Sequence, residues 1–146
     1  MEISWDALAL ALSAIALVIT YSQNKKINEI NLMSVYFNDI FKEYLLEKIP
    51  VALNKIRISE TDEKIKDFDD FLTQLDELRK KALYFKYNDK AFYDNLKNSL
   101  LNMEDWILDC SVARFVGNEQ KDFYNELQIK VQEIYRIISD KYINRK

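Results

Sequence analysis

The chain of 146 residues contains no histidine, one glycine, one proline and one cysteine. The turns of β-sandwiches and barrels use glycine and proline freely, so this composition favours an all-α protein. The missing histidine excludes Ser-His and Cys-His catalysis and histidine-ligated zinc. A single glycine excludes Gly-rich phosphate loops, and a single cysteine excludes an internal disulfide and cysteine-ligated metal centres. We therefore expect a non-enzymatic protein without a cofactor, in which Cys110 is a small core residue of a reducing compartment.

Charge is scarce at the start of the chain, where the first 24 residues contain two acids and no Lys or Arg. From Ala7 to Asn24, 18 consecutive residues are uncharged. As a helix they would be about 27 Å long, close to the hydrocarbon thickness of about 30 Å. Apolar residues cover the whole helical wheel, unlike in a core helix of a soluble domain. The pattern predicts a transmembrane anchor over residues 1–24 and a separate helical body over residues 25–146.

Both flanks of this segment fit a membrane span. Trp5 and Tyr21 lie at its ends, where aromatic side chains favour the membrane interface. Lys25 and Lys26 follow directly, and the positive-inside rule then places the body in the cytoplasm and the N-terminus outside. Two alternatives stay open: a signal peptide cleaved near Ala16, although its start would be acidic rather than basic, and a hydrophobic helix buried in an oligomer core.

Small residues recur along the segment in two sets, each on one helix face. The first set is Ala7, Ala11 and Ala14, and the second is Ala9, Ser13 and Ala16. Small faces let membrane helices approach closely, so we expect this helix to pack against copies of itself in a homo-oligomer. The alternative is that alanine is simply common in membrane helices.

The remaining sequence shows helical periodicity in four stretches. These are an amphipathic stretch from Ile27 that breaks near Pro50, a helix from about Ile65 to Leu83 with Ser59 and Thr61 as N-cap candidates, a helix capped by Asn88-Asp89 that extends to Cys110, and a last helix capped by Asn118 that extends to Tyr142. The apolar positions of four such helices can face one another. An antiparallel bundle of about four helices is therefore the predicted architecture.

Acidic residues gather on the second predicted helix of the body. They are Asp67, Asp69, Asp70, Asp76 and Glu77. A metal site needs acids that converge from different elements, so we interpret this group as a solvent-exposed face and predict no metal site.

Cations and aromatic residues alternate in the stretch from Arg79 to Leu96. The candidate ligand-binding residues are Arg79, Lys80, Lys81, Tyr84, Lys86 and Tyr87. Cations beside aromatic rings can bind phosphates and stack bases, so a signalling nucleotide is one candidate ligand. The alternatives are a helix C-terminus with cations whose neighbouring aromatics pack into the bundle, and attraction to anionic lipid headgroups. The net charge of −3 does not favour binding of double-stranded nucleic acid.

Two stretches resemble small membrane-anchored all-helical proteins associated with bacterial anti-phage defence. They are NLMSVYFNDIFKEYLLEKIP, Asn31 to Pro50, and LRKKALYFKYNDKAFYDNLKNSLLNMEDW, Leu78 to Trp106. The resemblance implies a single-pass protein of the bacterial inner membrane that oligomerises and permeabilises or depolarises the membrane on infection. Some helical defence domains are ribonucleases with a closely spaced Arg and His, but this chain has no His, so that activity is not carried over.

Three functional hypotheses follow from the sequence. The first is a membrane-anchored, non-enzymatic effector that self-assembles and perturbs the inner membrane in anti-phage defence. The second is a membrane-tethered receptor for a nucleotide signal, or an adaptor for a soluble protein partner. The third is an ordinary soluble bundle whose first helix forms a dimer core.

Overall fold

The computed structural model describes residues 17, 19–28 and 34–143. It groups the chain into two compact units, Met1–Asn38 and Asp39–Lys146. In the first unit the described residues are helical, and the side chains of residues 19–28 are exposed. The division that the charge pattern predicts, between residues 24 and 25, stays a prediction.

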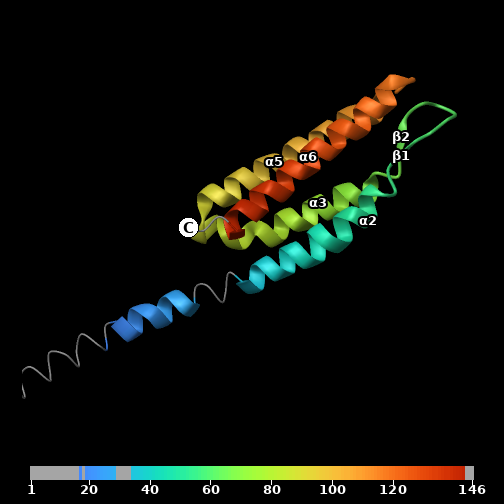
Figure 1. Ribbon diagram of the computed structural model, residues 1–146. Coiled ribbons are helices and arrows are strands. Elements are labelled where there is room, and N and C mark those ends of the chain that lie inside the picture. The colour runs from blue at the N-terminus through green and yellow to red at the C-terminus, as the bar shows by residue number, and fades with distance from the viewer. Residues whose placement is uncertain (1–16, 18, 29–33, 144–146) are drawn as a thin grey trace, which may run out of the picture. The chain divides into compact units, whose positions relative to one another are not determined.

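The second unit is a bundle of four helical segments joined by short connections (Figure 1). The first segment is η1 (Asp39–Lys48), with π-type hydrogen bonding, followed directly by α2 (Ile49–Leu53). The others are α3 (Asp69–Lys81), α5 (Lys90–Val112) and α6 (Asn118–Ile143), and η2 (Ala82–Tyr84) and α4 (Phe85–Asn88) join α3 to α5. The all-α prediction is confirmed for the described residues.

The predicted break near Pro50 is a change of helix type rather than an interruption, because the chain passes directly from η1 into the short helix α2. Pro50 is the second residue of α2, directly after the end of η1. The hydrogen-bonding pattern changes from π to α just before it, and the helix ends only after Leu53.

A two-stranded antiparallel hairpin connects α2 to α3. Its strands are β1 (Arg57–Ile58) and β2 (Ile65–Lys66), with Ile58 opposite Ile65. The sequence prediction missed this hairpin, and its N-cap candidates Ser59 and Thr61 were wrong. Ser59 lies in the hairpin turn, where its hydroxyl accepts a hydrogen bond from the Thr61 amide at 3.3 Å.

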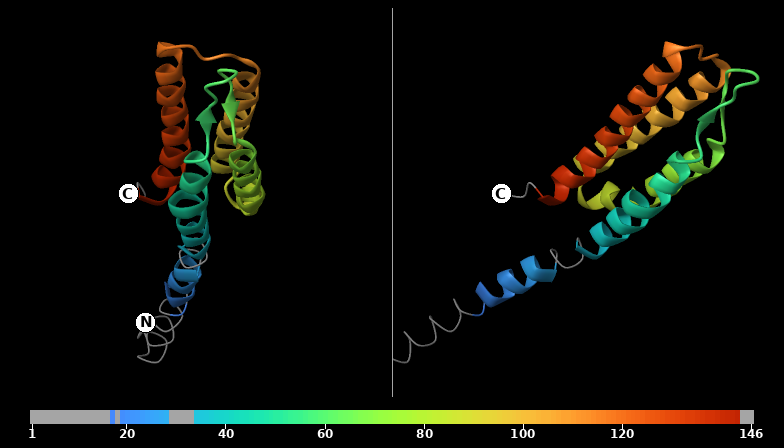
Figure 2. Two further views of the ribbon diagram at one scale, coloured as in Figure 1. Left: turned by 90° about the vertical axis from the view of Figure 1, so that its right-hand side faces the viewer. Right: turned by 45° about the vertical axis from the view of Figure 1, so that its right-hand side comes forward.

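The core is apolar and draws on all four helical segments. Its most deeply buried side chains include Tyr44, Leu45, Phe71, Leu75, Phe85, Leu96, Leu100, Met103, Ile107, Ile134 and Ile138. The views in Figure 2 show α5 and α6 side by side, with η1, α2 and α3 beside them and the hairpin near the α5–α6 connection. A main-chain hydrogen bond joins the hairpin to the α5–α6 connection. The Phe115 amide donates it to the Glu63 carbonyl at 2.8 Å.

Candidate functional site

The six residues of the predicted cationic site lie along the end of α3, η2 and α4. Arg79, Lys80 and Lys81 are consecutive in α3. Successive helical residues point about 100° apart, so the three cations do not leave the helix on one face.

Two of these cations are already paired with one carboxylate. Lys80 Nζ lies 2.6 Å from Asp76 Oδ2, and Arg79 also donates to Asp76. The hydrogen bonds from Lys80 and Arg79 lower the pKa of Asp76, and the bond to Asp76 raises the pKa of Arg79. Both cations therefore already have a carboxylate partner, which a phosphate would have to share or displace.

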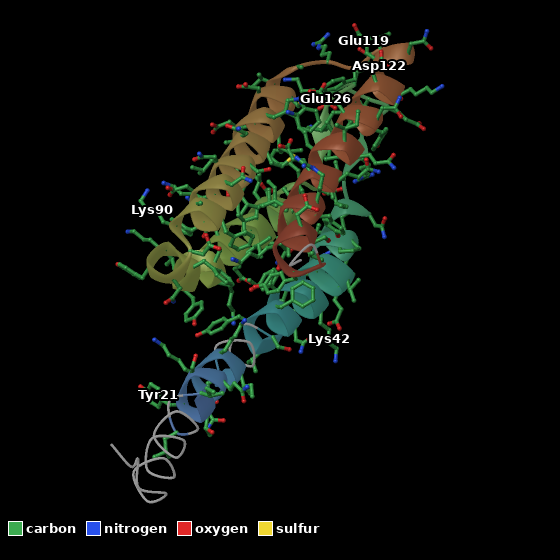
Figure 3. The ribbon with its side chains drawn as sticks, turned by 60° about the vertical axis from the view of Figure 1, so that its left-hand side comes forward. Tyr21, Lys42, Lys90, Glu119, Asp122 and Glu126 are labelled. Atoms are coloured by element: carbon green, nitrogen blue, oxygen red, sulfur yellow. The ribbon has the colours of Figure 1, made fainter. Side chains whose placement is uncertain are left out.

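The other members of the predicted site are spread over the surface. Lys86 lies 5.7 Å from the centre of the Tyr87 ring, and Tyr87 is 85% exposed. Tyr84 packs edge-on against the buried Phe85 ring, with centroids 5.3 Å apart. Figure 3 shows Lys90 at the same end of the bundle, and its ammonium pairs with Asp94 at 2.5 Å. The six residues thus lie on three successive elements, and a common ligand for them stays a prediction.

A second carboxylate, Glu104 of α5, faces this end of α3. Burial raises its pKa, the nearby Arg79 guanidinium opposes the rise, and the Asp76 charge adds to it. Its Oε1 atom is buried and accepts no hydrogen bond among the described residues. This arrangement indicates a structural contact between α3 and α5.

The residues predicted to pack membrane helices lie outside the described part of the chain. They are Ala7, Ala9, Ala11, Ser13, Ala14 and Ala16. Within residues 17, 19–28 and 34–143, no helix is both long and apolar enough to cross a membrane.

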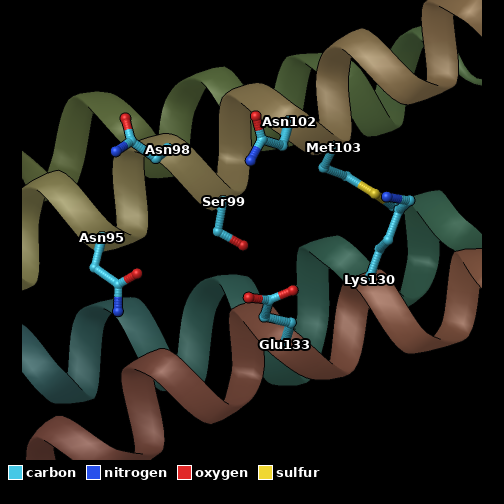
Figure 4. Close-up of a pocket in the computed structure, with 7 residues that line it drawn as sticks. All are labelled: Asn95, Asn98, Ser99, Asn102, Met103, Lys130 and Glu133. Carbon is cyan, nitrogen blue, oxygen red and sulfur yellow. The ribbon is translucent and has the colours of Figure 1, made fainter.

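A polar pocket of about 160 Å³ lies between α5 and α6 (Figure 4). From α5 it is lined by Asn95, Asn98, Ser99, Asn102 and Met103, and from α6 by Lys130 and Glu133. The positions 95, 98, 99 and 102 follow the i, i+3, i+4, i+7 spacing of one helix face. These four residues, which we call the amide row, border the buried face of α5. The amide row therefore lies where α6 approaches.

The polar groups of the amide row, Asn95, Asn98, Ser99 and Asn102, form no side-chain hydrogen bond to any part of the chain that the structure describes. Lys130 is held more firmly: its Nζ lies 3.8 Å from Glu126 and 5.3 Å from the centre of the Trp106 ring. In Figure 4 the Glu133 carboxylate points from α6 toward Ser99 and Asn102. The pocket therefore combines a cation, an anion and several amides that can each donate and accept.

The sequence analysis missed this pocket because it followed the apolar periodicity. The signal was NLKNSLLN, Asn95 to Asn102, in which three asparagines and a serine share a face of a predicted helix. Asparagine is a poor helix former, so a row of it in a helix interior is itself unusual.

A second cavity, of about 290 Å³, lies between α2 and α6 and is mostly apolar. It is lined by Leu53, Tyr124, Leu127, Gln128, Val131, Gln132 and Tyr135. Tyr135 bridges the same seam, because its hydroxyl donates to the Leu45 carbonyl at 2.6 Å.

The chain matches no protein-family model, no curated protein and no solved structure. No group of three or more metal-ligating side chains is found among the described residues. Cys110, predicted as a core residue, is half-buried, and burial raises the pKa of its thiol.

Proposed function

We propose that the protein is a membrane-anchored, non-enzymatic effector that self-assembles and perturbs the bacterial inner membrane in anti-phage defence. The observation that supports this most directly is the exposed apolar surface of the first unit. Leu17, Tyr21 and Ile27 are 70%, 74% and 52% exposed. Apolar surface that a chain does not bury itself marks a contact with lipid or with another chain.

In this proposal the anchor spans Ala7 to Asn24, and Lys25 and Lys26 hold the second unit in the cytoplasm. A single helix can perturb a bilayer only as an assembly. The small faces at Ala7, Ala11 and Ala14 and at Ala9, Ser13 and Ala16 provide the contact between copies.

The anchor is tested by membrane fractionation of tagged full-length protein. We expect the wild type in the membrane fraction, resistant to alkaline extraction. Leu12→Arg with Leu17→Arg introduces two charges, each costing about 3 kcal/mol at a bilayer centre, and should move the protein to the soluble fraction. Lys25→Arg with Lys26→Arg is the matched control and should leave it in the membrane. A wild type that stays soluble would contradict the anchor and favour the soluble-bundle alternative.

The assembly is tested with Ala11→Leu and Ala14→Leu together. Larger side chains should separate the helices, so the oligomer in detergent should become smaller and depolarisation of infected cells should be lost. Ile15→Leu with Val18→Leu changes two positions outside both small sets and is the control. Unchanged assembly and unchanged depolarisation in the alanine variant would rule out packing through these faces.

The second candidate is a membrane-tethered receptor for a nucleotide signal or an adaptor for a soluble protein. The α5–α6 pocket favours the receptor over the adaptor, because it is small, polar and lined by groups suited to a heterocycle. The predicted phosphate site at Arg79–Lys81 does not add to this case, since Arg79 and Lys80 are paired with Asp76.

A further inference from the structure

We propose that the pocket between α5 and α6 binds a guanine base. The inference concerns binding alone and does not depend on membrane anchoring or self-assembly. It rests on the size of the pocket, on the amide row and on the placement of Lys130 and Glu133.

The size of the pocket fits a ring. Its volume of about 160 Å³ is close to that of a closed engineered cavity of about 150 Å³ that holds benzene, but this pocket is open to solvent, with Asn95, Asn98 and Asn102 exposed. The buried side chain of Met103 lies against it, and a thioether makes favourable contact with aromatic rings. One ring of a base fits inside, and the rest of a nucleoside extends toward solvent.

The lining favours a heterocycle over a hydrocarbon. The carboxamides of Asn95, Asn98 and Asn102 each carry one acceptor and two donor hydrogens, and Ser99 adds a hydroxyl. An apolar ring would strip water from these groups without replacing its hydrogen bonds. A base offers donors and acceptors along its edges, and asparagine pairs with such edges through two hydrogen bonds.

The charged pair decides which base fits. Lys130 can only donate, and Glu133 can only accept when ionised. They are three residues apart on α6, so their Cβ atoms are about 5–6 Å apart. Guanine presents a carbonyl oxygen beside two N–H donors. The carbonyl oxygen would accept from Lys130, and the N–H donors would pair with the Glu133 carboxylate. Adenine presents an amino group beside a ring-nitrogen acceptor. The lone pair of that ring nitrogen would face the Glu133 carboxylate, and two acceptors cannot form a hydrogen bond.

The pocket's cation is oriented before any ligand binds. Its contacts to Glu126 and to the Trp106 ring restrict the Lys130 side chain. Glu133 makes no ion pair within the described residues, so its carboxylate needs no partner removed. Binding therefore displaces no partner of Glu133, and Lys130 shares its charge between Glu126 and the ligand.

Binding is measured by calorimetry on full-length protein in detergent, with guanosine, inosine and adenosine as probes. We expect guanosine to bind about tenfold more tightly than adenosine, since one bidentate pair discriminates by about that factor. Inosine, which lacks the exocyclic amino group, should fall between them. Trp106 fluorescence in a Trp5→Phe background should change with guanosine, because Trp106 contacts Lys130.

The variants assign the binding to this pocket. Glu133→Gln should weaken guanosine about tenfold and remove the preference over adenosine. Asp122→Asn, on the same helix but outside the pocket (Figure 3), should bind like the wild type. Asn98→Ala should weaken binding, whereas Asn125→Ala on the exposed face of α6 should not. Absence of guanosine binding, equal binding of guanosine and adenosine, or equal effects of the Glu133 and Asp122 variants would each overturn the proposal.

Discussion

Two residues near the hairpin take the left-handed backbone conformation that glycine usually supplies. Glu63 has φ 58° and Asp67 has φ 60°, and the one glycine, Gly117, has φ 57°. This conformation costs an L-residue roughly 1–2 kcal/mol, because Cβ approaches the following carbonyl. Asp67 is partly compensated, since its carboxylate accepts from Arg57 Nε at 2.6 Å. The Glu63 side chain makes no hydrogen bond or ion pair within the described part of the chain, so at this residue the glycine-poor composition costs stability.

Glu63→Gly should raise the free energy of unfolding by roughly 1 kcal/mol, because it relieves this strain while keeping the main-chain bonds of residue 63. Glu60→Gly, in the same turn without a positive φ, should lower it by roughly 0.5–1 kcal/mol through the added freedom of the unfolded chain. Urea unfolding monitored by circular dichroism measures both. A loss of stability in both variants would show that the backbone conformation of Glu63 is not strained.

The raised pKa of Glu104 predicts a pH-dependent effect on stability. Its pKa lies near 4.5 when unfolded and higher when folded, so folding binds a proton between the two values. The favourable contribution is present below pH 4.5 and is lost as pH rises through the folded pKa. Glu104→Gln should therefore be more stable than the wild type at pH 7, with the difference shrinking toward pH 4. Glu47→Gln, on the exposed surface, should stay within about 0.5 kcal/mol throughout. A difference for Glu104→Gln that is constant with pH would contradict this.

Among the helices, α5 has the best-defined start. Asp89 caps it by accepting a hydrogen bond from the Phe92 amide at 3.1 Å, and it also pairs with Lys141 at the end of α6. One carboxylate thus fixes the beginning of α5 and ties it to α6. In contrast, α3 begins after Phe68 without a side-chain cap.

Asp89→Ala should lower the free energy of unfolding by about 1–2 kcal/mol, because both interactions are lost. Asp89→Asn keeps a capping side chain and loses only the charge pair, so its cost should be smaller. Asp94→Asn breaks the exposed pair with Lys90 and should change stability by less than about 1 kcal/mol. Thermal unfolding of the three variants gives the order. Equal costs for the Asp89→Asn and Asp89→Ala variants would mean that the charge pair, not the cap, stabilises this end.

The helices that could be predicted were the long and strongly periodic ones. The spans of α5 and α6 follow from their apolar positions and from Asp89, Asn118 and Gly117. The hairpin could not be predicted, because each strand has two residues and no alternating pattern reaches that scale. The pairing of Arg79 and Lys80 with Asp76 could have been predicted, because Asp76 lies three and four residues before them on the same helix. The amide row became a candidate only once α6 lay beside it.

For the second unit as a whole, the weakest side of the bundle is the seam between α6 and the first helical segment. α6 packs chiefly along α5, and the α2–α6 cavity lies on its other side. The Tyr135 hydroxyl crosses this seam to the Leu45 carbonyl, and burial raises its pKa. The hydroxyl thus stays protonated and keeps donating at neutral pH.

Tyr135→Phe should lower the free energy of unfolding by about 1–2 kcal/mol, because the Leu45 carbonyl loses its side-chain donor across the seam. Tyr124→Phe, at an exposed position lining the same cavity, should change it by less than about 0.5 kcal/mol. Chemical unfolding of both variants distinguishes the effect of losing the Tyr135 hydrogen bond from the effect of removing any tyrosine hydroxyl. A Tyr135 variant as stable as the wild type would show that the seam does not need this bond.

The bond between the Phe115 amide and the Glu63 carbonyl has a consequence for the order of folding. The contacts within α3, α5 and α6 join residues close in sequence and form with little loss of chain entropy. This bond instead closes a loop from the hairpin turn to the α5–α6 connection, so it requires α3 and α5, which lie between the two residues, to be packed together. The Phe115 amide is therefore protected from hydrogen exchange only while α3 and α5 are packed together, and its exchange rate reports the opening of that contact.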